Sequence, residues 1–92
     1  MTAKRIYFEG RVQGVGFRYT TRRVAQGFEV VGWVKNLPDG RVQMEVMSND
    51  PAELDAFIEE IRANSPLAHH IKNVSTESIP PLTGLTGFDI IH

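Results

Sequence analysis

A turn near the middle of the chain constrains the fold more than any other feature of the sequence. The segment LPDG, residues 37–40, separates two runs rich in β-branched residues, 30–36 and 41–48. Proline fixes φ for such a turn, and glycine accepts the positive φ that a tight turn requires. The sequence therefore predicts a β-hairpin, and helical patterns precede and follow it along the chain.

Both flanking segments carry hydrophobic residues at helical spacing. The first has Gly27 placed to end the helix, and its stripe consists of Phe17, Thr21, Val24, Ala25 and Phe28. The second begins with a predicted capping box between Asp50 and Glu53, with Pro51 at the first helical position. Its stripe consists of Leu54, Phe57, Ile58 and Ile61. The segment 64–66, Asn-Ser-Pro, is expected to end this helix.

Alternating and β-branched segments supply the remaining strands. The pattern predicts strands over residues 6–12, 71–79 and 88–91, with a loop over residues 80–87. The order β-α-β-β-α-β is that of the split β-α-β, or ferredoxin-like, sandwich. We therefore expect a single α+β domain, residues 1–92, with an antiparallel sheet covered on one face by two helices. The short extra strand lies at its C-terminal end.

The segment GRVQGVGFR, residues 10–18, places three glycines within seven positions. Each glycine costs about 0.5–1 kcal/mol relative to alanine, so the segment needs a structural or functional reason. A glycine-rich loop that leads into a helix presents unpaired N–H groups and the positive end of the helix dipole, which favour an anion. Arg18 can add a planar, bidentate donor for phosphate or carboxylate. Because the segment matches no standard nucleotide-binding motif, it predicts an anion-binding loop and nothing narrower.

The expected topology predicts what lies beside this loop. In a β-α-β unit the two strands are parallel, so their carboxyl ends lie at the same edge of the sheet. The first strand is expected to end near Val12 and the second near Asn36. Residues 13–18 and Asn36 should therefore be neighbours in the folded protein.

Composition narrows the class of protein. The chain has no cysteine, which excludes disulfides and cysteine nucleophiles and fits a reducing cytoplasm. It shows no signal-peptide pattern and no apolar run of the ~20 residues that a membrane helix needs. The net charge is −1, yet most basic side chains lie in residues 1–41, which gives that half a positive potential. We expect a cytoplasmic monomer that binds a small anion, and neither nucleic acid nor membrane.

GRVQGVGFR, together with GWVKNLPDGRV at residues 32–42, resembles the two signatures of the acylphosphatase family, in the same order and at the usual separation. The acidic second helix and a terminal F-x-I at Phe88 and Ile90 extend the resemblance across nearly the whole chain. One departure is Ser48, which stands where the second signature usually ends in glycine. This residue is at the far end of its strand and is expected to affect local packing more than chemistry.

The resemblance implies a ferredoxin-like sandwich that hydrolyses acyl phosphates to carboxylate and inorganic phosphate, without metal or cofactor. It implies that Arg18 is the essential phosphate-binding arginine and that Asn36 orients the attacking water. It also implies that a stretch of backbone holds the phosphate oxygens, formed by Gln13, Gly14, Val15, Gly16 and Phe17.

The side chains near the predicted site fit this chemistry. They can position groups and stabilise charge, but no acid stands ready to protonate a poor leaving group. An acyl phosphate needs none, because it leaves as a carboxylate whose conjugate acid has a pKa of about 4. The histidines are far from the loop in the sequence and are not assigned to the site; they are His69, His70 and His92.

Other classes of protein share parts of this pattern. A non-catalytic module could bind the same anion without turnover, and an acylphosphatase-like domain of a larger protein could act on carbamoyl phosphate. An RNA-binding domain can have the same order of elements, but its third strand carries aromatic residues that residues 41–48 lack. Hydrolysis of an acyl phosphate by the purified protein separates an enzyme from a sensing module.

Overall fold

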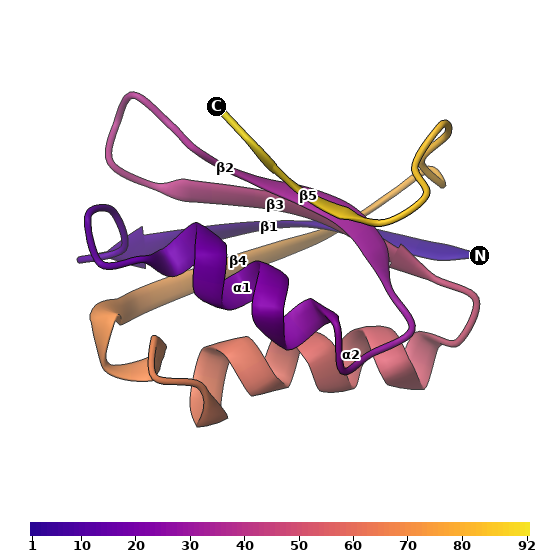
Figure 1. Ribbon diagram of the computed structural model, residues 1–92, viewed down its shortest axis with the longest axis horizontal. Coiled ribbons are helices and arrows are strands. Elements are labelled where there is room, and N and C mark those ends of the chain that lie inside the picture. Colours follow the sequence, from indigo (N-terminus) through magenta and orange to yellow (C-terminus); the bar gives the residue numbers. More distant parts are fainter.

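The strands and helices follow the predicted order in the computed structural model, which describes residues 1–92 (Figure 1). The first half of the chain forms β1 (Thr2–Gly10), α1 (Phe17–Ala25), β2 (Val31–Asn36) and β3 (Val42–Ser48). The second half forms α2 (Pro51–Glu59), a π-helical turn η1 (Glu60–Asn64), a 3₁₀ turn η2 (Ala68–His70), β4 (Ile71–Ile79) and β5 (Phe88–Ile91). None of the helices is long and apolar enough to cross a lipid bilayer.

The strands form one sheet in the order β4-β1-β3-β2-β5. β3 pairs antiparallel with both β1 and β2, so β1 and β2 are parallel to each other with β3 between them. This is the split β-α-β arrangement. β5, the short extra strand, pairs parallel with β2, so it makes an otherwise antiparallel sheet mixed. The direction of β5 follows from where β4 ends. The last residue of β4 lies at the end of the sheet at which β2 begins. After the loop over residues 80–87, β5 starts at that same end and is therefore parallel to β2.

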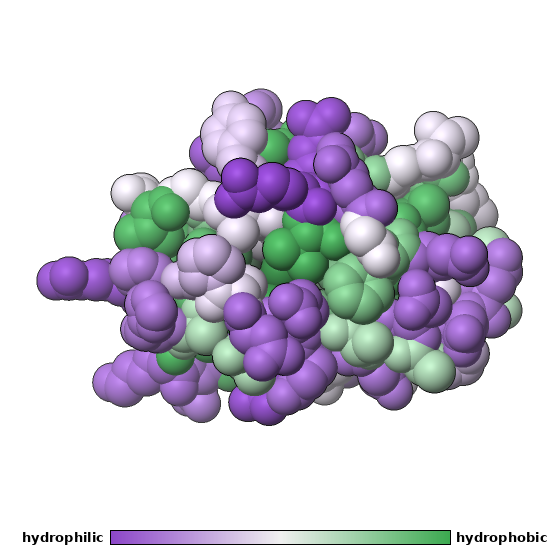
Figure 2. All heavy atoms as spheres, turned by 60° about the horizontal axis from the view of Figure 1, so that its bottom comes forward, coloured by the Kyte–Doolittle hydropathy of each residue, from purple (hydrophilic) through white to green (hydrophobic).

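Both helices pack on the same face of the sheet and enclose the hydrophobic core (Figure 1). Alternate strand residues supply fully buried side chains to it, among them Ile6, Phe8, Val34 and Met44. The ring of Phe57 joins the layers, with its centroid 5.8 Å from that of Phe28 and 5.7 Å from that of Phe88. Figure 2 shows the helix side from outside, where hydrophilic side chains cover most of the surface and hydrophobic side chains show in a seam near its centre.

Helix α2 begins as predicted, but with only half of the predicted capping box. The carboxylate of Asp50 accepts from the N–H of Ala52 at 3.0 Å, and Pro51 occupies the first turn. Glu53 does not return to the N–H of Asp50; its Oε1 accepts from the N–H of Glu29 at 3.1 Å. A tertiary contact with the segment before β2 therefore replaces the local one.

Ser48, and not Glu53, accepts the hydrogen bond from the N–H of Asp50. Its buried hydroxyl accepts from the N–H of Asp50 at 3.1 Å and donates to the carbonyl of Glu29 at 2.6 Å. Ser48 lies at the opposite end of β3 from the β2–β3 turn, since Val42 is the residue that pairs with Asn36. The hydroxyl thus fastens the start of α2 to the chain before β2, as expected for a residue that affects packing.

Candidate functional site

The glycine loop and the β2–β3 turn meet at one end of the sheet, as the parallel relation of β1 and β2 predicted (Figure 1). Gln13 makes the connection. Its side-chain Nε2 donates to the carbonyls of Leu37, at 2.8 Å, and Arg41, at 3.0 Å. A single amide thereby holds the loop against both sides of the turn that follows Asn36.

The three glycines of the loop serve two different purposes. Gly14 and Gly16 have φ values of +77° and +76°, with nothing within 4 Å of where a Cβ would lie, so the left-handed backbone alone calls for glycine. At Gly10, with φ +126°, a Cβ would also lie 2.5 Å from the carbonyl oxygen of His70. Gly10 therefore allows β1 to approach the start of β4, whereas Gly14 and Gly16 shape the loop.

The start of α1 presents a row of unused hydrogen-bond donors. Thr20 is the first residue whose N–H joins the helix, donating to the carbonyl of Gly16 at 3.0 Å, and the N–H groups of residues 13–19 donate to no other group of the protein. No side chain caps the helix, and its first turn contains no acidic residue. Unpaired N–H groups at the positive end of a helix dipole form an anion site.

Arg18 adds a full positive charge at the same place. It lies in the first turn of α1, where a cation is unfavourable for the helix by about 0.3–1 kcal/mol. Its side chain is half-buried, and its Nη1 lies 3.1 Å from Nδ1 of His92. The guanidinium of Arg18 is repelled by the helix dipole and forms no ion pair with a carboxylate. An anion bound between the guanidinium and the start of the helix would compensate both unfavourable features.

Asn36 is the last residue of β2. It pairs with Val42 and lies on the same face of the sheet as the buried Val34 two residues earlier, which is the helix side. The hydrogen bonds of this region involve Gln13 and Arg18 and leave the amide of Asn36 unpaired. The bond from Gln13 to the carbonyl of Leu37 places the start of the loop next to the residue that follows Asn36, in keeping with the predicted topology.

His92 is the residue of this region that the sequence analysis missed. It was set aside because it is far from the loop in the sequence, yet β5 pairs Ile91 with Lys35, and the next step of that register places His92 opposite Asn36. The topology could have identified His92. If β5 is a parallel neighbour of β2, its carboxyl end is expected beside Asn36 and the loop.

The β2–β3 turn is held by its own charged pair. The carboxylate of Asp39 accepts from the backbone N–H of Arg41 at 3.0 Å and from its Nε at 2.8 Å. These two bonds, the backbone one foremost, hold the pKa of Asp39 below its usual range. Gly40 takes φ +95° in the same turn, as the LPDG pattern predicted.

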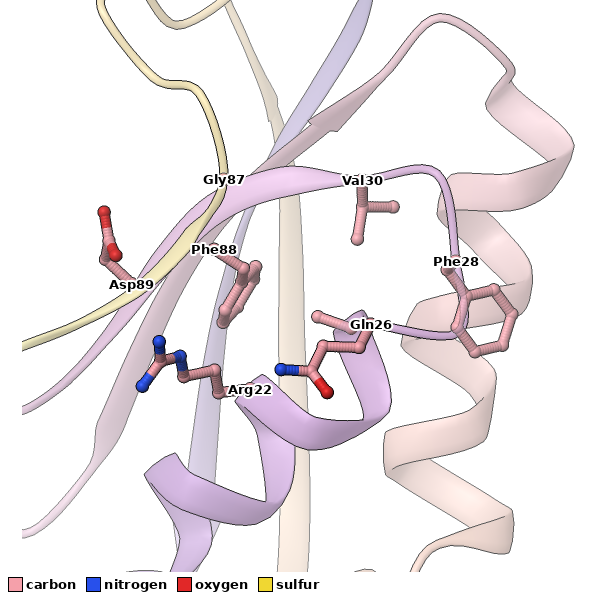
Figure 3. A pocket seen from close by; sticks show the side chains of 8 residues that line it. Arg22, Gln26, Phe28, Val30, Gly87, Phe88 and Asp89 are labelled. Carbon is pink, nitrogen blue, oxygen red and sulfur yellow. The ribbon is translucent and has the colours of Figure 1, made fainter.

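The largest pocket of the protein lies beside this site and not over it (Figure 3). It has a volume of about 380 Å³ between the later part of α1 and the start of β5. In Figure 3 the side chain of Arg22 reaches from α1 toward β5, near Phe88 and Asp89. Neither Arg18 nor Asn36 lines this pocket, so the candidate site and the pocket are separate.

Residues with metal-binding side chains do not gather at this site. No three or more His, Asp or Glu side chains lie together anywhere in the protein as a metal centre would require. His69 and His70 lie side by side in η2, with ring centroids 5.5 Å apart. The polar groups available at the loop are therefore N–H donors, a guanidinium, an amide and an imidazole.

Together these features define an α+β sandwich with unpaired N–H donors at the start of its first helix, a candidate anion site. Comparison with known proteins identifies the family. Residues 4–90 match the acylphosphatase family. An acylphosphatase from Pediococcus pentosaceus is 42% identical over 84 residues, which span 91% of this chain and 92% of that protein. The chain belongs to the acylphosphatase family.

Solved structures agree with this assignment. The crystal structure of acylphosphatase from Bacillus subtilis matches with a TM-score of 0.88 and 36% identity over 100% of both chains, and has the same ferredoxin-like sandwich. T. kodakarensis HypF matches with a TM-score of 0.82 and 32% identity, over 100% of this chain but 12% of that one. The same fold therefore also occurs as a small part of a longer protein.

Proposed function

We propose that this protein hydrolyses acyl phosphates to a carboxylate and inorganic phosphate, with no metal ion or cofactor. The observation that carries the proposal is the set of unused N–H donors over residues 13–19 beside Arg18, at the sheet edge where Asn36 ends β2. The loop and Arg18 bind the phosphoryl oxygens. Asn36 holds the attacking water through its unpaired amide.

The chemistry of this site favours an acyl phosphate over other phosphate esters. Phosphoryl transfer depends mainly on positioning and charge stabilisation, and this site offers both. It offers no carboxylic acid beside Arg18 or Asn36 to protonate an alkoxide. A carboxylate leaves without that help because its conjugate acid has a pKa of about 4.

The proposed reaction is a single in-line displacement. The oxygen of the water held by Asn36 attacks phosphorus, and the bond between phosphorus and the acyl oxygen breaks. The bonding electron pair departs with the carboxylate. The proton of the water passes to a phosphoryl oxygen of the substrate, and inorganic phosphate remains on the loop until Arg18 releases it.

Hydrolysis of benzoyl phosphate in the presence of EDTA tests the function. We expect turnover by the unaltered protein and a loss of about 100-fold or more in kcat/KM for Arg18→Ala, as for loss of a donor to the transition state. Arg22→Ala, one helical turn away and exposed, is the matched control and should retain activity. No turnover by the unaltered protein would leave a non-catalytic anion-binding module.

A second pair of variants tests the role of Asn36. Asn36→Ala should lower kcat more than it raises KM, because the amide acts on the water and not on the phosphate. Asn73→Ala, at an exposed position in β4, should change neither. Full activity in Asn36→Ala would show that the water is held elsewhere. Carbamoyl phosphate as a second substrate shows whether the site is selective for the acyl group.

We further propose that the protein acts as a cytoplasmic monomer. The hydrophobic core is enclosed within this one chain, and the cysteine-free sequence suits a reducing compartment. Sedimentation of the purified protein at the concentration used for kinetics tests the monomer. A dimer under those conditions would contradict it.

A further inference from the structure

The end of β5 brings an imidazole to the proposed phosphate site. The parallel register pairs Ile91 with Lys35, so His92 follows opposite Asn36 on the helix side of the sheet. Nδ1 of His92 lies 3.1 Å from Nη1 of Arg18. A guanidinium can only donate, so Nδ1 accepts and the proton of the neutral ring lies on Nε2.

We propose that His92 is a positioning residue of the phosphate site: as a neutral acceptor it holds the guanidinium of Arg18 in place without cancelling its charge. The proposal rests on the function proposed above, since it gives Arg18 the phosphate as its ligand. A carboxylate in place of His92 would also hold the guanidinium but would neutralise it and repel the phosphate. An imidazole leaves four of the five N–H donors of Arg18 for the anion.

The charged groups of the neighbouring elements do not offer Arg18 another acceptor. On α1, Arg22 follows one turn later and lines the pocket of Figure 3. On β5 and β2, Asp89 and Lys35 alternate with the buried-side residues and therefore lie on the open face of the sheet. None of the ion pairs of the protein includes Arg18, so His92 is the side chain that restrains it.

Restraint of this kind affects binding more than chemistry. Immobilising a long side chain when a ligand binds lowers the affinity. A side chain that is already held in place avoids part of this cost, and the part avoided corresponds to an affinity about 2- to 10-fold higher. Because Arg18 contacts the phosphoryl group in both the ground state and the transition state, the loss of restraint should appear in KM and leave kcat nearly unchanged.

Three substitutions at His92 separate these effects, assayed at about pH 8, where histidine side chains are ordinarily neutral. His92→Leu removes the acceptor, His92→Gln keeps a neutral acceptor, and His92→Glu replaces it with a charged one. His69→Leu, an exposed histidine of η2, is the matched control. KM and kcat for benzoyl phosphate are measured with the inhibition constant of inorganic phosphate, and calorimetry measures phosphate binding without turnover.

We expect His92→Leu to raise KM and the dissociation constant of phosphate about 2- to 10-fold with kcat within about twofold of the unaltered protein. His92→Gln should restore much of the loss, and His92→Glu should bind phosphate more weakly than His92→Leu. Unchanged constants in His92→Leu, or tighter binding, would overturn the positioning role. If the unaltered protein binds phosphate without turnover, the proposed function is refuted but the role of His92 is not. Calorimetry of phosphate binding by the variants then still tests whether His92 positions Arg18.

Discussion

The two helices of this protein begin in opposite ways. Helix α2 starts with Asp50 capping an N–H group, Pro51 in the first turn and an acidic residue, Glu53, within it. Helix α1 starts at Gly16 in a left-handed conformation, with no side-chain cap and no acid in its first turn. A side-chain cap, a proline and an acidic residue are present in the first turn of α2 and missing from that of α1.

This difference separates stability from function within one small protein. At the start of α2, Pro51 has no N–H group, and Asp50 accepts from the N–H groups of Ala52 and Leu54. The start of α1 leaves its donors free and adds the charge of Arg18 to the positive end of the helix dipole. The features that make the start of α1 less stable, free N–H groups and no carboxylate, are those that favour binding of an anion. The first three predictions below change one helix start at a time, and the fourth changes the β2–β3 turn.

Among the variants below, the largest effect should come from the backbone of the α1 start. Gly16→Ala places a Cβ on a residue with φ +76° and should lower the free energy of unfolding by about 1–2 kcal/mol. Because the loop then shifts its N–H groups, kcat/KM should fall about tenfold or more. Gly84→Ala is the matched control, with φ +77° and equal space, in the loop before β5. It should show the same change in chemical denaturation without the change in activity; equal activity in both variants would contradict a role for the loop geometry.

Removing the cap of α2 should have the reverse pattern. Asp50→Ala should lower the free energy of unfolding by about 0.5–2 kcal/mol, because the N–H of Ala52 loses its acceptor. For a domain of this size that corresponds to roughly 4–8 °C in Tm per kcal/mol. Thermal unfolding and benzoyl phosphate kinetics are measured together. A loss of kcat/KM in the folded variant would show that the two helix starts are not independent.

A carboxylate in the first turn should stabilise α1 at the expense of its ligand. Tyr19 is exposed there, and Tyr19→Glu should raise the free energy of unfolding by about 0.3–1 kcal/mol at low ionic strength. The same charge should weaken phosphate binding, and added salt should reduce both effects. Ala52→Glu in α2 should gain less stability, because Asp50 and Glu53 already supply carboxylates there, and should leave phosphate binding as it was. Stronger phosphate binding by Tyr19→Glu would place the anion elsewhere.

The smallest expected effect is on stability, from Asp39 in the β2–β3 turn. Hydrogen bonds from Arg41 lower its pKa in the folded state, so its stabilising contribution is present above the unfolded-state value near 4. That contribution is lost as the pH falls through the lower, folded-state pKa. Asp39→Asn should therefore be less stable than the unaltered protein at pH 6, and the gap should close in acid. Urea denaturation at a series of pH values measures it; a gap that widens in acid would contradict the assignment.

Local pattern predicted much of this fold. The hairpin at LPDG, both helices and the strands over residues 71–79 and 88–91 depend on turn chemistry and periodicity that short segments carry within themselves. The meeting of the loop with the β2–β3 turn needed only the rule that the strands of a β-α-β unit are parallel. The hydrogen bonds of Gln13 now support that inference.

What the sequence did not predict depends on contacts between distant segments. Glu53 fits a capping box by spacing, but the N–H of Glu29, 24 positions away, competes for it once the sheet has formed. The parallel pairing of β5 depends on where β4 ends, which no local pattern records. That same pairing carries His92 to the end of the sheet where Asn36 lies, so without a partner and direction for β5 the sequence offered no reason to connect His92 with Arg18.

The position of β3 between β1 and β2 also has a consequence for folding. The loop follows β1 and Asn36 ends β2, yet these strands do not touch, and each is held only through β3 or an edge strand. Pairing β1 with β3 joins residues such as Arg5 and Glu45, which lie 40 positions apart along the chain, and such non-local pairings form slowly. Since β1 pairs with both β3 and β4, activity after dilution from denaturant should return no earlier than the docking of β1 between these strands.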